Sequence, residues 1–146
     1  MAAKILLVTE STDNMAKLEM SLSPYGHEVI PVADLPSAYH MLENDSTIDL
    51  VLCDLNARTG DSFEFLKQIR ADHVRADMPF IFIVDEQHLL TDNIYKAAAI
   101  HGTDKFIFMD EFHPHKVRCA IEAELPPQLS SLPPPGDRDA GLQTGL

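Results

Sequence analysis

The chain has 146 residues, of which 45% are hydrophobic, and this is enough for one domain with its own core. The formal net charge of −12 at pH 7 argues against nucleic acid or an anionic membrane as a direct partner, because phosphates would be repelled. The sequence has neither an apolar run of about 18 residues nor a secretory signal pattern, so we expect a cytoplasmic protein.

Five short apolar segments predict β-strands. In chain order they are Lys4–Val8, His27–Val32, Ile48–Cys53, Pro79–Val84 and Lys105–Met109. The second contains Pro31, which has no backbone N–H to donate, so we expect it at an edge of the sheet. Segments with helical spacing of apolar residues alternate with these strands, at Asp13–Ser23, Pro36–Glu43, Ser62–Asp72, Leu89–His101 and Pro114–Glu124.

Strands that alternate with helices predict right-handed βαβ units and a parallel sheet covered on both faces. The predicted fold class is α/β, a flavodoxin-like three-layer α/β/α fold whose five-stranded parallel sheet has the order 2-1-3-4-5. This domain spans residues 1–125. Residues 126–146 are rich in Pro, Gly and Ser and lack periodicity, so we expect a disordered tail that folding does not need.

An acidic residue, Asp54, directly follows the third predicted strand. In sheets of this order, ligands bind beyond the carboxyl ends of strands one and three, where the strand order reverses. Glu10 follows the first strand, so its carboxylate should converge with that of Asp54. An aspartate at a strand end also serves as a helix cap, but Asp61 and Ser62 are better placed to cap the next helix. The sequence therefore indicates Asp54 as the centre of the candidate site.

The chain resembles the receiver domains of response regulators in two-component signalling, over about residues 3–125. The segments that carry the resemblance are DLVLCDLNARTGDSFEFLKQIR, KILLVTES, MPFIFIV and HGTDKFIFM. It implies that Asp54 accepts a phosphoryl group from a histidine kinase, forming an acyl phosphate. It also implies a Mg²⁺ ion held by Asp54, by the acidic position Thr9–Glu10 and by the backbone carbonyl of Asn56, with Phe106 as a switch aromatic.

The chain departs from the family pattern at several of these positions. Thr9 replaces an acid, Val84 stands where the family has Ser or Thr, Met109 replaces a Lys, and Asp110 replaces the following Pro. Neither Val84 nor Met109 offers a hydrogen bond to a phosphoryl oxygen. We therefore expect an atypical receiver in phosphorelay signalling that binds Mg²⁺ weakly, is not an enzyme, and acts through protein–protein contact.

Two other functions remain open from the sequence. A phosphorylation-independent pseudo-receiver would bind its partner without any change at Asp54. A flavodoxin-like FMN carrier would use the hydroxyl-rich turn TESTDNMAK to hold a phosphate, but it also needs aromatic side chains on the later loops, and the chain has no Trp. The expected partner is a histidine kinase or another signalling protein, and a homodimer is also compatible with the sequence.

Overall fold

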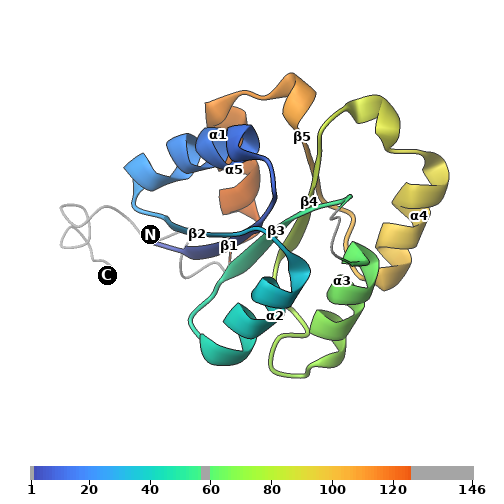
Figure 1. The fold of residues 1–146 in the computed structure, drawn as a ribbon. Coiled ribbons are helices and arrows are strands. Elements are labelled where there is room, and N and C mark those ends of the chain that lie inside the picture. Colours follow the sequence, from blue (N-terminus) through green and yellow to red (C-terminus); the bar gives the residue numbers. More distant parts are fainter. Residues whose placement is uncertain (1, 57–59, 126–146) are drawn as a thin grey trace, which may run out of the picture.

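The computed structural model describes residues 2–56 and 60–125, so the predicted tail at 126–146 lies outside the described residues (Figure 1). Five strands form one parallel sheet in the order β2-β1-β3-β4-β5, which confirms the predicted order. The strands are β1 (Lys4–Val8), β2 (Glu28–Val32), β3 (Leu50–Asp54), β4 (Phe80–Val84) and β5 (Phe106–Phe108). The helices are α1 (Thr12–Leu22), α2 (Leu35–Asn44), α3 (Ser62–Ala71), α4 (Asp92–His101) and α5 (Pro114–Ala123).

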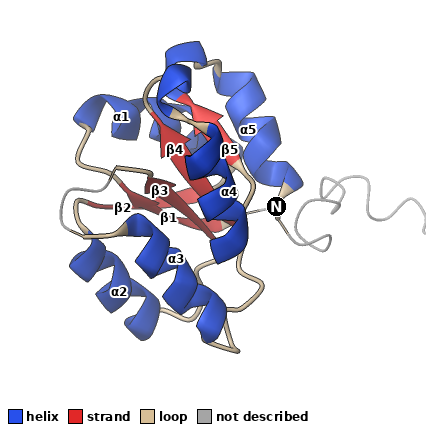
Figure 2. Ribbon diagram, turned by 90° about the vertical axis from the view of Figure 1, so that its right-hand side faces the viewer, coloured by secondary structure: helices blue, strands red, loops and turns tan. Residues whose placement is uncertain are grey.

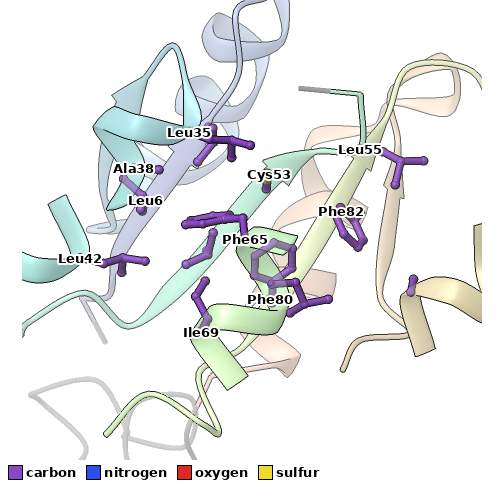
Figure 3. Packing of buried hydrophobic residues seen from close by; sticks show 14 of the residues in the cluster. Leu6, Leu35, Ala38, Leu42, Cys53, Leu55, Phe65, Ile69, Phe80 and Phe82 are labelled. Atoms are coloured by element: carbon purple, nitrogen blue, oxygen red, sulfur yellow. The ribbon is translucent and has the colours of Figure 1, made fainter. Parts of the chain in front are cut away.

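The helices form two layers around the sheet (Figure 2). Helices α1 and α5 lie on one face, and α2, α3 and α4 lie on the other. Successive residues of β1 point to opposite faces, so Leu6 packs with Phe65 of α3 whereas Leu7 packs with Leu18 of α1. Figure 3 shows the first of these two clusters, in which phenylalanines of β4 and α3 meet leucines of α2. The three-layer α/β/α prediction is confirmed.

The ends of several elements differ from the prediction for local reasons. The helix predicted from Leu89 begins at Asp92, because the Thr91 hydroxyl caps it by accepting a hydrogen bond from the Ile94 N–H at 3.3 Å. A 3₁₀ turn, η2 (Gln87–Leu89), precedes it. The last strand ends at Phe108, and Met109 opens another 3₁₀ turn, η3 (Met109–Glu111).

Asp61 caps α3, and it is one of the two residues, Asp61 or Ser62, that the sequence favoured for this role. Its carboxylate accepts hydrogen bonds from the backbone N–H groups of Phe63 and Glu64. Asp54 therefore does not cap α3, and its carboxylate is available to the site described below. Pro31 lies in β2, an outer strand of the sheet, as expected for a residue without an N–H donor.

Arg70, near the end of α3, links two loops at the amino end of the sheet, opposite the site. Its guanidinium donates hydrogen bonds to the carbonyls of Gly102 (3.0 Å) and Met78 (2.7 Å). Gly102 ends α4 with a φ of +121°, a conformation that L side chains rarely adopt. A Cβ atom at this position would lie 2.8 Å from the Arg70 Cγ, so only glycine allows the close approach.

Within residues 2–56 and 60–125, no helix combines the length and the apolar character needed to cross a bilayer. The longest described helix, α1, has 11 residues.

Candidate functional site

An acidic cavity of about 260 Å³ opens at the carboxyl end of the sheet. Its lining residues are Glu10, Ser11, Asp54, Asn56 and Asp85. Strand β1 pairs with β3 in a register that aligns Val8 with Cys53, so the residues that follow the two strands emerge side by side. The three predicted residues Glu10, Asp54 and Asn56 thus share one cavity, and the end of β4 adds Asp85.

Thr9 takes a direct part in this site. Its hydroxyl donates a hydrogen bond of 2.7 Å to Oδ2 of Asp54, and it accepts one of 3.0 Å from the backbone N–H of Ser11. The Thr9 side chain is buried, with 1% of its surface exposed. In the resemblance to receiver domains Thr9 is a missing acid, whereas in the structure it is the donor that fixes the orientation of the Asp54 carboxylate.

Burial raises the pKa of Asp54 to about 6. The hydrogen bond from Thr9 lowers this pKa and the nearby Asp85 carboxylate raises it. Glu10 acts in both directions, because its backbone hydrogen bond lowers the pKa and its carboxylate raises it. No Lys or Arg is among the described residues that line the cavity, so these carboxylates repel one another without a compensating side chain.

Two carboxylates fix the segment between β4 and α4. Oδ1 of Asp85 accepts a hydrogen bond of 2.8 Å from the Asn14 side chain of α1. Oδ2 of Asp110 in η3 accepts one of 3.0 Å from the Gln87 N–H. Neither contact was predicted from the sequence, in which Asp110 replaces a proline and adds negative charge. Asn14 did leave a signal, because it shares the buried face of α1 with Leu18 and Leu22, where a polar side chain needs a partner.

The predicted switch positions Val84 and Met109 are part of the two cores. Val84 is 1% exposed and packs in the cluster on the α3 face, and Met109 is 6% exposed and packs in the cluster on the α5 face. Phe106 stacks on Phe82 of β4 at 6.0 Å and on Tyr95 of α4 at 5.4 Å between ring centroids. Neither the Val84 nor the Met109 side chain carries a hydrogen-bond donor.

The donor set of the cavity suits a hard cation, since carboxylate and amide oxygens are the ligands that Mg²⁺ prefers. The described part of the chain, however, contains no group of three His, Cys, Asp or Glu side chains placed to hold a metal ion. Oδ2 of Asp54 is also occupied by the Thr9 hydroxyl. The residues therefore fit an ion that keeps most of its water and takes one or two protein carboxylates, which is a common mode for Mg²⁺.

The same lining argues against the flavin alternative. The described residues around the cavity include no aromatic side chain on which an isoalloxazine ring would stack, and their negative charge would repel the phosphate of FMN.

No family model matches the sequence, and neither does any curated protein. Solved structures do resemble the fold. The chemotaxis response regulator CheY4 of Vibrio cholerae has a TM-score of 0.75 at 21% identity, over 86% of this chain and 100% of that one. A two-component response regulator from Clostridium difficile has a TM-score of 0.71 at 20% identity, over 84% and 94%. The Mn²⁺-bound form of response regulator Rcp1 has a TM-score of 0.69 at 21% identity, over 83% and 92%.

Proposed function

The chain has the fold of response-regulator receiver domains, and we propose that it works as an atypical receiver-type signalling domain in a phosphorelay. In this proposal Asp54 is the phosphoacceptor and the output is protein–protein contact, without enzymatic turnover. The observation that carries the proposal is the position of the Asp54 carboxylate. It is partly buried at the carboxyl end of β3, it lines an open cavity, and it shares that cavity with Glu10.

The proposed step is a phosphoryl transfer from a phosphohistidine of a kinase. An oxygen of Asp54 attacks the phosphorus, the P–N bond to the histidine breaks, and an acyl phosphate forms. Thr9 holds the carboxylate in one orientation, and the cavity of about 260 Å³ leaves room beside it. A divalent cation at Glu10, Asp54 and the Asn56 carbonyl would supply the positive charge that offsets the charge on the transferring group.

The readout of such a transfer is weakened in this chain. A lysine contact to a phosphoryl oxygen is worth about 1.5–3 kcal/mol and a threonine contact about 1 kcal/mol, so Met109 and Val84 together forgo about 2.5–4 kcal/mol. That is similar to the few kcal/mol that separate two conformations of a switch. We therefore propose that phosphorylation changes the shape of the domain little, and that a histidine kinase or another signalling protein recognises its surface. The net charge of −12 supports a protein partner over nucleic acid or membrane.

A second candidate function, a phosphorylation-independent binding module, is favoured by the hydrogen bonds that already occupy the acidic groups. The Thr9 hydroxyl binds Asp54, Asn14 binds Asp85, and the Gln87 N–H binds Asp110. In this reading the contacts that a phosphoryl group would organise are made by the chain itself.

Incubation with a small phosphodonor and Mg²⁺, followed by intact-mass measurement, separates the two functions. The receiver proposal expects one added phosphoryl group, absent in Asp54→Asn. If no phosphoryl group is added under conditions that label an ordinary receiver domain, the pseudo-receiver replaces it. Amide spectra with beryllofluoride, a phosphoryl mimic, then test the weak readout. The natural chain should show changes near Asp54 only, and the double variant Val84→Thr, Met109→Lys should extend them to the β4–α4 segment and Phe106.

A further inference from the structure

A second cavity, of about 290 Å³, lies between α1 and α5 and does not share any residue with the acidic cavity. Figure 1 shows these two helices side by side on one face of the sheet. Two large apolar side chains stand exposed at this place, Met20 with 57% and Tyr25 with 56% of their surface accessible. The groove is completed by two prolines and by basic or aromatic groups, namely Pro24, Pro114, His113 and Arg118.

A series of contacts through Arg118, Glu122 and His27 holds the Tyr25 ring in place. The Arg118 guanidinium carbon lies 3.9 Å from the centre of the Tyr25 ring, a cation–π arrangement. Nη1 of Arg118 pairs with Glu122 at 3.2 Å, and the other carboxylate oxygen of Glu122 lies 2.8 Å from Nε2 of the buried His27. The ring and the guanidinium are therefore held in place before anything binds, which lowers the entropy cost of binding.

We propose that this groove binds the proline-rich segment of the same chain, Leu132 to Gly136, whose sequence is LPPPG. Aromatic grooves recognise proline runs because the pyrrolidine ring packs flat against an aromatic face, and because a residue with a fixed φ loses little entropy on binding. The inference does not depend on any chemistry at Asp54, so it goes beyond the proposed function.

The geometry of the chain allows this contact. Leu125 is 4% exposed and packs in the core cluster that α1 and α5 share, so the following residues start from the correct face of the sheet. Leu125 lies seven positions after Arg118, a rise of about 10 Å at the helical spacing of about 1.5 Å per residue. Six residues lie between Leu125 and Leu132, and six residues of extended chain can span up to roughly 19 Å at about 3.1 Å per residue. A tether of this length gives an effective concentration in the millimolar range, so even a weak contact is populated.

Limited trypsin digestion of the full chain tests the proposal, because Arg138 lies directly beyond the proline run. If the run is docked, cleavage after Arg138 should be slow in the natural chain. It should become at least about threefold faster in Tyr25→Ala, because cleavage then follows the undocked population. The matched control is Tyr95→Ala on α4, a tyrosine of similar exposure at 46%, which should leave the rate unchanged. Equal rates in Tyr25→Ala and the natural chain would overturn the proposal.

A second measurement leaves the folded domain untouched. Replacing Pro133, Pro134 and Pro135 by serine should shift the amide signals of Met20, Tyr25 and Arg118. The same exchange at Pro126 and Pro127 should not. Shifts confined to residues outside the groove would refute the docking. The cleavage rate must also be independent of protein concentration. A rate that falls on concentrating the sample would assign the contact to two copies of the chain and overturn the intramolecular proposal.

Discussion

Replacing Asp54 by Asn should stabilise the protein at neutral pH, because it removes one charge from a cavity that has no basic side chain among its described lining residues. The pKa of Asp54 is raised to about 6 by burial, whereas the unfolded chain ionises it near 3.8. The gap of about two pH units corresponds to about 3 kcal/mol at about 1.4 kcal/mol each. Solvent reaches part of this side chain, so we expect about 1–2 kcal/mol.

The sign follows from proton linkage. Because the folded-state pKa lies above the unfolded value, the protonated carboxyl favours the folded state, and this contribution is fully present below pH 3.8. It is lost as the pH rises through about 6. The advantage of the Asn variant over the natural chain should therefore be full at pH 7.5 and should fall toward zero near pH 4.

Urea unfolding of both proteins at pH 7.5, 6, 5 and about 4 measures this difference. Asn keeps a side-chain oxygen that accepts the hydrogen bond from Thr9, so the variant isolates the charge. Asp104→Asn, an exposed position outside the cavity, is the control for removing one negative charge from an acidic chain, and it should change stability at pH 7.5 by less than about 0.5 kcal/mol. A variant that is no more stable at pH 7.5, or whose advantage grows with acid, would refute the reasoning.

Three further predictions concern other parts of the structure. Gly102→Ala should lower the free energy of unfolding by about 1–3 kcal/mol, because of its positive φ and its contact with Arg70, as urea unfolding will show. Asn14→Ala should cost about 1–2 kcal/mol and speed amide exchange in residues 85–91, because Asp85 loses its partner; unchanged exchange there would contradict a role in fixing this segment. A chain that ends at Leu125 should melt cooperatively within a few degrees of the full chain, since docking of the tail through one small groove adds little stability; calorimetry of both chains measures this.

Most of the fold follows from local sequence signals. The first, third and fourth strands read as unbroken apolar runs because both faces of a parallel sheet are buried, and this pattern located them to within two residues. Pro31 indicated that its strand lies at an edge of the sheet, because proline has no backbone N–H to donate. The errors lie where a single side chain decides a boundary. The apolar pattern predicted that α4 starts at Leu89. The helix starts at Asp92 instead, because Thr91 caps it.

The part of the candidate site that depends only on strand order was predictable from the sequence. The strand order alone places Glu10 and Asp54 at one edge of the sheet. The hydrogen bonds were not predictable in the same way, because their partners are far apart in sequence. Thr9 and Asp54 are 45 residues apart, and Asn14 and Asp85 are 71 apart. Thr9 acts as a hydrogen-bond donor only because its hydroxyl lies 2.7 Å from the Asp54 carboxylate. The residues that neighbour Thr9 in the sequence do not reveal this distance.

The substitutions at the site act together rather than one by one. Met109 is uncharged, and no Lys or Arg among the described lining residues of the cavity offsets the mutual repulsion of Asp54, Glu10 and Asp85. The chain offsets that repulsion with neutral donors, a hydroxyl on Asp54 and an amide on Asp85, each worth about 1–3 kcal/mol to a charged acceptor. The Asn14–Asp85 and Gln87–Asp110 hydrogen bonds form without any ligand, and they stabilise one arrangement of the β4–α4 segment. A ligand shifts an equilibrium only by its differential affinity for two states, so a segment already fixed by its own side chains would respond little to the phosphoryl transfer that we propose.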